Sequence, residues 1–522
     1  MTAESPGAAR ADLFGQRLLA AAHQRLTASD LGEAERLTRA ALDLPGAAGT
    51  IRARLLNLLG GIQRVHGDHA ASLSSFDAAI AADENLADAH ANRAAALIAL
   101  GRSAEAPASL DRALALDPSH QQALNTAGVL LAAANRLEAA VDCYRRAIDA
   151  GASDVDTLCN LGNALGRLDR LEEAEAAFLA AQARDPAQPR PFAGLGKVAM
   201  DGGRLEQADE DYRAVLDRVP NDADAHMSRG FIALLRGDLA AGWAGYEWRW
   251  RLRDGPTPPP EPRWRGEALA GRTLLLQAEQ GFGDTLQCVR YAKQAARQGA
   301  RVIVRCQRPL VRLLETAPGV DVVVAMEDSL PRFDFAAAML DLPGLFGTTL
   351  ETVPADIPYL TPPSPVSQLD AALGDDPRPK VGLVWAGNPR HRNDRRRSLP
   401  EDAVTELIED AAVRFFSLQK PAASTPDGMT DLAPILDDFA DTAAAIARFD
   451  LVVSVDTSVA HLAGALGKPV WVLLPFAPDW RWMVGRTDSP WYPTMRLFRQ
   501  EGRGDWPGVI ARVRKALSDF RP

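Results

Sequence analysis

The sequence predicts a multidomain protein with two parts of different fold class: an all-α array of helical repeats, then an α/β region built as two lobes. Three observations carry this prediction. A pattern of small and bulky residues recurs every 34 residues through the first half. From Gly271 onward, short apolar runs alternate with helical patterns. Between the two regions, residues 253–270 are rich in proline. Because proline interrupts regular structure, we expect a linker there.

Two repeated positions define the helical array. A small residue recurs at intervals of 34 residues, at Gly60, Ala94, Gly128, Gly162, Gly196 and Gly230. A bulky residue follows sixteen positions after each, at Phe76, Leu110, Tyr144, Phe178, Tyr212 and Tyr246. Small residues let paired helices approach closely, and the bulky side chain fills the space between them. This pattern resembles the tetratricopeptide repeat, and over residues 15–252 it predicts a superhelix of about seven units that binds a protein partner.

The first helices of the predicted repeats carry four amides, Asn57, Asn92, Asn125 and Asn160. They are loosely similar to the asparagine ladder of repeat-bearing protein glycosyltransferases, which implies binding to the backbone of an acceptor. Ordinary solvated helix faces are the alternative. The array ends in an aromatic segment, residues 243–250, which we interpret as a cap that docks the repeats onto the next domain.

Composition argues against several classes of protein. A formal net charge of −10 gives no bulk attraction to nucleic acid or to an anionic membrane. No apolar run reaches the length of a membrane span and the N-terminus has no secretory pattern, so we expect a cytoplasmic protein. The four cysteines lack paired spacing, and we expect reduced core thiols at Cys143, Cys159, Cys288 and Cys306.

The second half predicts parallel sheet covered by helices on both faces. Apolar runs typical of buried strands occupy residues 273–278, 301–306, 380–386, 413–419, 451–455 and 469–474. We expect two lobes, residues 271–364 and 365–522. Ligands of such sheets bind beyond the carboxyl ends of the strands, so the loops that follow the strands are expected to hold the site.

Two of these loops have an unusual composition. The loop after residues 273–278 contains Gly281, Gly283 and Asp284, in which the glycines permit a tight turn and the carboxylate stands at a helix start. An ordinary helix cap is the alternative for Asp284. The loop after residues 380–386 has five arginines and one aspartate between positions 390 and 397. We expect it to bind phosphate, with a solvated charged face as the alternative.

A third polar segment lies between the last two predicted strands. Thr457 or Ser458 is expected to cap the helix that begins there, and the free N–H groups of such a helix start attract an anion. Asp456 is expected to accept from a sugar or ribose hydroxyl, and His461 lies one turn further on. A capped core helix with a hydrogen-bonded histidine is the alternative.

Three stretches, residues 281–287, 393–400 and 456–469, together resemble the lipopolysaccharide heptosyltransferases, which have the two-lobed GT-B fold. The resemblance implies that Asp284 is the catalytic base. It also implies that the first lobe faces the acceptor, with Gly281 and Gly283 and the four repeat asparagines as weaker acceptor contacts, and that the second lobe binds the donor. The residues implied around the donor are Asn388, Arg396, Arg397, Asp456, Thr457, Ser458, Val459 and His461.

The combination with repeats is similar to bacterial tetratricopeptide-repeat glycosyltransferases, including those that modify flagellin, and to the architecture of O-linked N-acetylglucosamine transferases. Gln419 and Lys420, which end the run at 413–419, resemble the glutamine and lysine that the latter place on the donor. The resemblance implies transfer of a sugar from a nucleotide sugar to Ser or Thr of a protein held by the repeats, with flagellin as one candidate.

We expect a single inverting displacement that needs neither a metal nor a cofactor, because the nucleotide sugar is a co-substrate. The Asp-x-Asp pattern of metal-dependent glycosyltransferases occurs at residues 154–156, 209–211 and 222–224, all within the predicted repeats. Two alternatives stay open. One is transfer to a glycan or a lipopolysaccharide core. The other is a repeat scaffold with an inactive transferase domain, because the first lobe has only about 95 residues.

Overall fold

A computed structural model describes residues 6–28, 30–44, 49–279, 281–362, 368–391, 393–409, 412–420 and 425–521. The chain divides after Val198 into two compact units. Predicted boundaries at 252/253 and 270/271 therefore fall inside the second unit, and the boundary at 364/365 lies outside the described residues.

Fourteen α-helices precede the first strand in the described part of the chain, as expected for about seven helix pairs. These helices are α1 (Pro6–Thr27), α2 (Leu31–Leu42), α3 (Gly49–Val65), α4 (His69–Ala82), α5 (Ala87–Ala99), α6 (Ala106–Leu116), α7 (Gln121–Ala133), α8 (Leu137–Asp149), α9 (Val155–Arg167), α10 (Leu171–Arg184), α11 (Pro189–Asp201), α12 (Leu205–Arg218), α13 (Ala223–Arg236) and α14 (Leu239–Tyr246). Consecutive helices pack in pairs, for example α3 with α4 and α9 with α10.

The repeated glycines are explained by the aromatic ring sixteen residues later. A Cβ atom on Gly60 would lie 2.6 Å from the ring of Phe76, and one on Gly128 would lie 2.5 Å from the ring of Tyr144. Any side chain there would collide with the ring, so close packing at these two positions requires glycine. The predicted division of roles between the small and the bulky residue is therefore confirmed.

The last repeat departs from this pattern. A Cβ atom on Gly230 would lie 2.7 Å from the backbone of Gly245, so here two backbones touch, whereas Gly60, Gly128 and Gly162 face an aromatic ring. Tyr246, which the period places as the space-filling ring, instead lies 4.7 Å from the guanidinium of Arg249. The end of the repeat array thus presents Tyr246 and Arg249 to the α/β region of the same unit.

The second unit contains two parallel sheets. The first sheet has the strand order β3-β2-β1-β4. Its strands are β1 (Thr273–Gln277), β2 (Arg301–Cys306), β3 (Val322–Ala325) and β4 (Phe335–Ala338). The second sheet has the order β10-β9-β8-β5-β6-β7. Its strands are β5 (Lys380–Val384), β6 (Arg414–Ser417), β7 (Thr430–Asp431), β8 (Leu451–Val455), β9 (Val470–Leu474) and β10 (Met495–Arg499).

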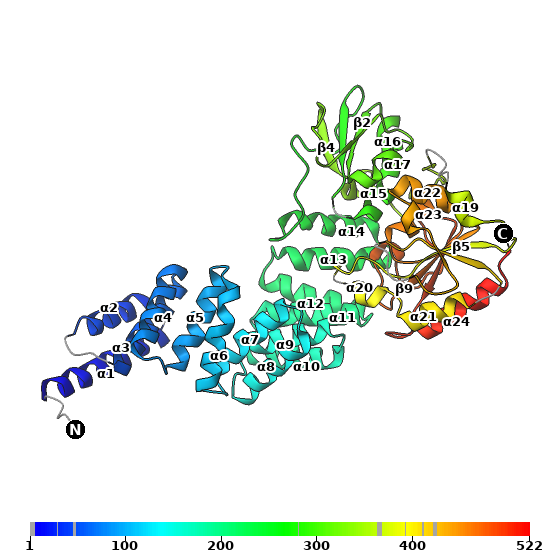
Figure 1. Ribbon diagram of the computed structural model, residues 1–522. Coiled ribbons are helices and arrows are strands. Elements are labelled where there is room, and N and C mark those ends of the chain that lie inside the picture. The colour runs from blue at the N-terminus through cyan, green and yellow to red at the C-terminus, as the bar shows by residue number, and fades with distance from the viewer. Residues whose placement is uncertain are drawn as a thin grey trace. The chain divides into compact units, whose positions relative to one another are not determined.

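Helices cover both faces of the six-stranded sheet (Figure 1). Val381, Leu383 and Val453 pack in one buried cluster with residues of α21 and α24, while α22 and α23 lie on the opposite face. The α-helices after the repeats are α15 (Phe282–Cys288), α16 (Ala292–Arg297), α17 (Val311–Leu314), α18 (Leu342–Leu345), α19 (Leu369–Leu373), α20 (Asp394–Arg397), α21 (Glu401–Ile408), α22 (Phe439–Ala447), α23 (Ser458–Ala465) and α24 (Trp506–Ser518). The α/β fold predicted from the alternating pattern is confirmed.

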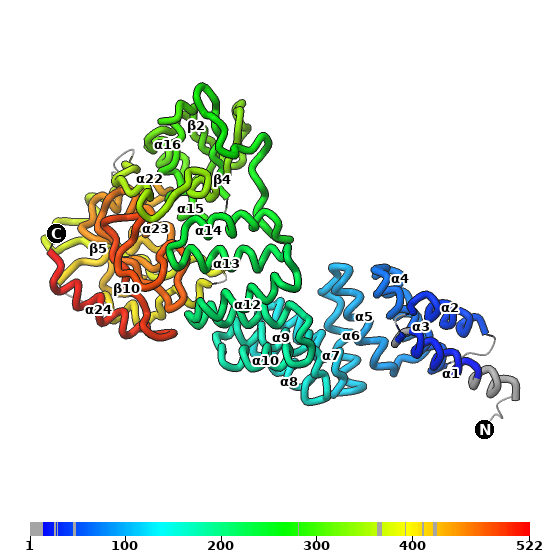
Figure 2. The backbone as a smooth tube through the Cα atoms, turned by 180° about the vertical axis from the view of Figure 1, so that it is seen from behind, coloured from blue at the N-terminus to red at the C-terminus, as the bar shows by residue number. Residues whose placement is uncertain are grey.

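The aromatic cap docks the last repeat onto the sheets, as predicted. Trp243 of α14 meets Trp480 edge to face at 5.1 Å, and α14 packs against α18 of the first lobe. Figure 2 shows from behind that α14 lies beside α15 and the four-stranded sheet, in agreement with Figure 1. The last repeat is therefore part of the scaffold that surrounds the site.

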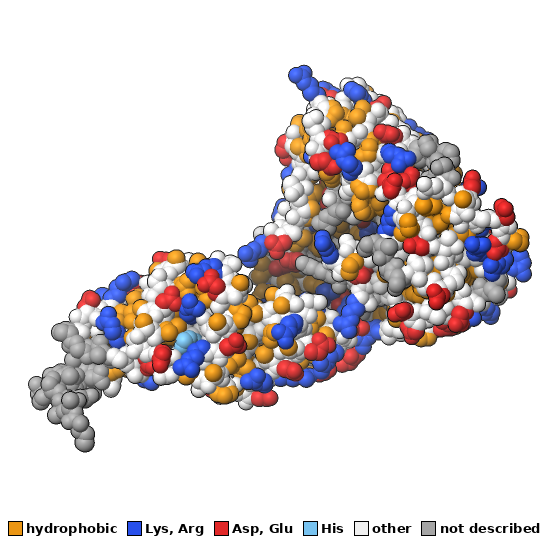
Figure 3. Space-filling model, viewed as in Figure 1, with side chains coloured by type: hydrophobic (Ala, Val, Ile, Leu, Met, Phe, Trp, Pro, Cys, Tyr) orange, Lys and Arg blue, Asp and Glu red, His pale blue; other side chains and the backbone are white. Residues whose placement is uncertain are grey.

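The cysteines, the charged surface and the apolar character of the helices can be compared with what the composition predicts. The four cysteines are free, and Cys159, Cys288 and Cys306 are buried, as expected of core thiols. On the face shown in Figure 3, acidic and basic side chains are interspersed over the repeats. No helix among the described residues is long and apolar enough to cross a membrane.

Candidate functional site

The candidate site gathers around the loop that follows β1. Asp284 lies in the first turn of α15, where its Oδ2 atom accepts from the N–H of Gly281 at 3.3 Å. Its Oδ1 atom pairs with Nη2 of Arg481 at 2.6 Å, and the side chain keeps 23% of its surface exposed. The carboxylate is thus held from two sides and remains partly open.

Gly283 brings this loop into contact with the second lobe. A Cβ atom on Gly283 would lie 2.8 Å from the ring of His461, one turn into α23. Phe282 packs beside Phe439 of α22, with ring centroids 4.9 Å apart. The structure therefore brings Gly281, Gly283 and Asp284 against the predicted donor helix, which sequence spacing alone did not establish.

The donor helix α23 begins after the buried strand β8, as predicted. Thr457 occupies the N-cap position, but its side chain makes no capping hydrogen bond. Its hydroxyl instead lies 2.9 Å from that of Ser454 in the preceding strand. The prediction of a side-chain cap was therefore wrong for Thr457, because the buried Ser454 hydroxyl is a nearer partner. Ser458 is the first residue of the helix and Val459 is buried beside it.

His461 is a buried, hydrogen-bonded core histidine. Its Nδ1 atom lies 3.0 Å from the hydroxyl of Tyr492, and its ring stacks on Trp482 at 5.2 Å. Burial, with Arg481 and Arg290 nearby, holds the pKa of His461 well below its ordinary range, so the ring is neutral. This placement matches the alternative interpretation, in which the histidine packs the helix.

Asp456 lies between the strand and the helix and is partly buried. The pKa of Asp456 is raised from an ordinary value of 3.8 to about 6. Burial is the main cause, and the charge of the neighbouring Asp479 is the second. Strongly shifted pKa values cluster at functional sites, so the raised pKa makes Asp456 a candidate functional residue.

This raised pKa predicts a pH dependence of stability. Between about pH 4 and pH 6 the folded state holds a proton on Asp456 that the unfolded chain has released, so the free energy of unfolding falls as pH rises through this window. Asp456→Asn is expected to remove part of this fall, on the order of 1 kcal/mol. Thermal unfolding from pH 4 to 7 measures it, with the exposed Asp519→Asn as control. Parallel curves for wild type and Asp456→Asn would contradict the assignment.

The arginine-rich loop is tied to its surroundings on both sides. Nε of Arg397 donates to Asp394 at 3.1 Å, and Nη1 donates to the backbone oxygen of Asp456 at 2.9 Å. Arg396 pairs with Asp201 at the end of α11 at 2.9 Å. Asn388 is exposed, and its Oδ1 atom accepts from the N–H of Arg390 at 3.0 Å. Of these predicted donor residues, the structure brings only Arg397 against Asp456.

Gln419, which follows β6, has a structural role because its side chain holds the loop after β5. Its Oε1 atom accepts from the N–H groups of Trp385 and Ala386 at 3.2 and 3.0 Å, and its Nε2 atom donates to the oxygen of Ala386 at 3.0 Å. Only 3% of its surface is exposed. Lys420, the next residue, is exposed. Between the two predicted donor residues, only the lysine keeps its polar group at the surface.

The four repeat asparagines lie in the first unit and bond to one another in two pairs. Asn92 donates to Asn57 at 2.9 Å, and Asn160 donates to Asn125 at 3.1 Å. Gln122 donates in turn to Asn92, and Arg190 donates to Asn160. These amides hold successive repeats together, and a peptide backbone would have to compete with those bonds.

Sequence reasoning missed a buried ion cluster beside the site. Arg249, which is only 4% exposed, donates from Nε and Nη2 to the two carboxylate oxygens of Glu279 at 3.0 and 2.9 Å, and from Nη2 to Asp341 at 2.6 Å. Glu279 lies two residues after the end of β1 and two residues before Gly281. The signal present in the sequence was the alternation Trp248, Arg249, Trp250, Arg251, in which Arg249 lies between two tryptophans.

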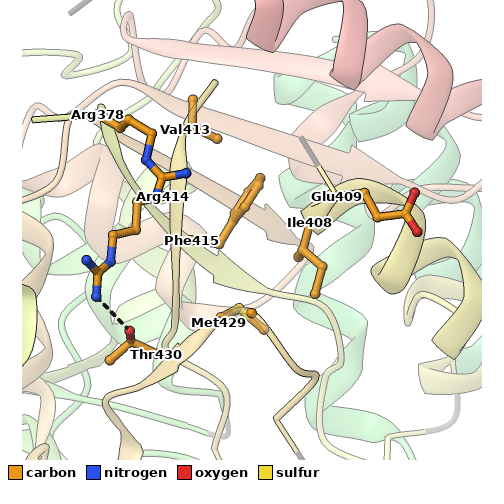
Figure 4. A pocket seen from close by; sticks show the side chains of 9 residues that line it. Arg378, Ile408, Glu409, Val413, Arg414, Phe415, Met429 and Thr430 are labelled. Carbon is orange, nitrogen blue, oxygen red and sulfur yellow. Dashed lines mark hydrogen bonds between the residues drawn. The ribbon is translucent and has the colours of Figure 1, made fainter. Parts of the chain in front are cut away.

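A cavity of about 290 Å³ lies elsewhere in the second lobe, lined by Val413, Arg414, Phe415 and residues of the α21 end (Figure 4). It opens at the amino end of β6, opposite the carboxyl ends where parallel sheets bind ligands. It contains none of the predicted site residues. Among the residues that the structure describes, no group of three or more His, Cys, Asp or Glu side chains is placed to hold a metal ion.

A tetratricopeptide repeat model matches residues 91–155, 125–189 and 194–242. The model of glycosyltransferase family 9 (heptosyltransferase) matches residues 415–474, which run from β6 through β9. Protein FlbA of Caulobacter vibrioides is 31% identical over 340 residues, which are 58% of this chain and 56% of FlbA. The match therefore spans about half the length of this relative.

Two solved structures are similar to the repeats. PilW, a type IV pilus biogenesis factor, is 22% identical with a TM-score of 0.35, over 38% of this chain and 92% of PilW. YrrB, a TPR protein with an unusual peptide-binding site, is 23% identical with a TM-score of 0.30, over 35% of this chain and 93% of YrrB. The family-model matches identify tetratricopeptide repeats in the first part of the chain and glycosyltransferase family 9 sequence at residues 415–474.

Proposed function

We propose that the protein is an inverting glycosyltransferase that moves a sugar from a nucleotide sugar to a protein acceptor bound by the repeats. One observation carries this proposal: Asp284 and the helix start at Asp456–Ser458, which lies inside the family 9 match, belong to one site held by the Gly283–His461 contact. Two parallel sheets with their loops toward this site support a GT-B arrangement.

The residues support a single displacement at the anomeric carbon. Asp284 takes the proton of the acceptor hydroxyl as its oxygen attacks, since a carboxylate within hydrogen-bond reach serves as a general base. The bond from the anomeric carbon to the donor phosphate breaks, and the phosphate leaves with the electron pair. We propose that Arg397, Lys420 and the start of α23 stabilise that charge, without a metal or a cofactor.

We propose that the acceptor is a protein and that Ser or Thr of flagellin is the first candidate to test. The tetratricopeptide repeats support a protein partner, because stacked helix pairs offer an extended surface for one. Transfer to a glycan or a lipopolysaccharide core is the alternative within the same chemistry. A scaffold without activity is favoured by one observation, namely that Gln419 and His461 are both buried in internal hydrogen bonds.

Donor hydrolysis and acceptor mass separate these readings. The purified chain is incubated with UDP-, GDP-, ADP- and CMP-sugars, with and without flagellin, and released nucleotide and intact acceptor mass are measured. We expect release of one nucleotide and an acceptor mass increase of one sugar. Release without any mass increase would show transfer of the sugar to water and would argue against flagellin, so glycan acceptors would be tested next, and no release with any donor would favour the scaffold.

The donor phosphate site makes a separate prediction. Arg397→Ala is expected to weaken nucleotide affinity roughly 10- to 100-fold, because a charge-assisted hydrogen bond contributes about 1.5–3 kcal/mol. Arg395→Ala, an exposed neighbour in α20, is the matched control and should bind nucleotide like wild type. The measurement is an equilibrium titration. Equal dissociation constants for Arg397→Ala and the control would remove the arginine loop from the phosphate site.

A further inference from the structure

We infer that Arg481 is a positioning residue for Asp284: fixed in the second lobe, its guanidinium reaches the first lobe and orients the base. This inference rests on the proposed function, because it assigns a role within the same reaction. Arg481 lies in the short 3₁₀ helix Trp480–Trp482, in the connection between β9 and β10, and is separated from Asp284 by almost 200 residues of sequence.

Every nitrogen of the guanidinium has a protein acceptor. Nη2 donates to Oδ1 of Asp284 at 2.6 Å, and Nε donates to Oε1 of Gln287, one helical turn later, at 2.7 Å. Nη1 donates to Oδ1 of Asp479 in its own lobe at 2.8 Å. The planar group therefore bridges two residues of α15 and one of the second lobe in a fixed geometry, which a lysine cannot reproduce.

The surroundings hold Arg481 where it is. The residue is 8% exposed, and its guanidinium lies 4.3 Å from the ring of the buried Trp480. Gln287, its partner in the first lobe, is 1% exposed. The buried guanidinium of Arg481 therefore binds protein groups of the two lobes and is not open to a phosphate of the donor.

The contact determines which way the base points. One oxygen of Asp284 is held by Arg481 from the second lobe and the other by the N–H of Gly281 from the first. Gly283 lies in the same loop as Gly281 and contacts the ring of His461 in the second lobe. The loop therefore keeps this conformation only while the two lobes are packed together. Displacement of a reacting group by 1 Å typically costs about 10²-fold in rate, so loss of this anchor is expected to slow the chemical step.

Variants of both residues test the inference. Arg481→Gln is expected to lower kcat roughly 100-fold with the donor KM within about threefold of wild type. Arg481→Lys, which keeps the charge but not the fork, is expected to recover part of kcat. Arg486→Gln is the matched control, since Arg486 lies in the same connection and its side chain pairs with the exposed Asp488.

The double variant distinguishes positioning from a structural role. If Arg481 acts through Asp284, the Asp284→Asn, Arg481→Gln double variant is no slower than Asp284→Asn alone, because effects of residues that act as a unit do not add. Independent, multiplying losses would overturn the inference, as would a kcat for Arg481→Gln within about twofold of the Arg486→Gln control.

Two further readouts keep the result decisive. Thermal unfolding identifies variants that fail to fold; should Arg481→Gln unfold, the comparison of Arg481→Lys with its Asp284→Asn double variant replaces it. A wild-type chain that turns over no donor would overturn the proposed function and the inference together. A working wild type with additive losses would overturn the inference alone.

Discussion

Asp284→Asn is expected to lower the turnover of sugar transfer by roughly 10² to 10⁴ while nucleotide-sugar affinity stays within about threefold. The asparagine keeps the shape of the side chain but cannot take the proton of the acceptor hydroxyl. Arg481 keeps Asp479 and Gln287 as partners, so the lobes are expected to stay packed. Steady-state rates and a donor titration on the same preparation measure the two effects separately.

The control for this variant is Asp356→Asn, which removes a carboxylate of the first lobe that is 83% exposed and pairs only weakly, at 3.3 Å, with Lys293. Its turnover should equal that of the wild type. A near-normal rate for Asp284→Asn would remove this carboxylate from the chemical step, while loss of rate together with loss of donor binding would indicate damage to the fold.

Arg249→Met is expected to destabilise the second unit by about 3–5 kcal/mol, because it leaves buried carboxylates without their cation. Burial raises the pKa of Glu279 and of Asp341, against the opposing effect of Arg249, so both carboxylates depend on that charge to stay ionised. The thermal midpoint should fall by roughly 5 to 15 °C. The loss should be smaller in acid than at neutral pH, since protonated carboxyls no longer need the cation.

Two comparisons make this second prediction specific. Arg251→Met changes an exposed arginine of the same 3₁₀ helix, Glu247–Arg251, and is expected to cost little. The triple variant Arg249→Met, Glu279→Gln, Asp341→Asn removes all three charges of the cluster. Its thermal midpoint should return most of the way to that of the wild type, because no charged group is left to be buried without a partner. Equal midpoints for Arg249→Met and Arg251→Met would contradict a role for the cluster in holding the last repeat to the first lobe.

The fold was largely predictable because most of its elements depend on sequence patterns within one helix pair or one strand. The 34-residue period followed from pairs such as Gly60 with Phe76, which meet inside one helix pair. Strands β1, β2, β5, β6, β8 and β9 were predicted from continuous apolar runs. The strand β4, Phe335–Ala338, was not, because three alanines have little strand preference and its pairing with β1 bridges about 60 residues.

The candidate site was predictable in position but less so in the roles of its residues. Polar loops after buried strands located Asp284, Arg397 and Asp456 correctly at one end of the sheets. The single sequence could not tell that the polar groups of Thr457, Gln419 and His461 are used inside the protein, because their partners come from neighbouring elements. Arg481 and Arg249 were missed for the same reason: each meets the site from a distant segment.

We propose that the second unit binds a nucleotide sugar beside Asp284 and Asp456. A titration of the full chain with UDP, GDP, ADP, CMP and their sugar conjugates, followed by thermal unfolding, tests it most directly. We predict that one nucleotide stabilises the chain by about 2.7 kcal/mol at a concentration one hundred times its dissociation constant, and that Arg397→Ala loses this effect at the same concentration. No stabilisation by any nucleotide in the panel would contradict the claim and leave the repeats as the functional part of the chain.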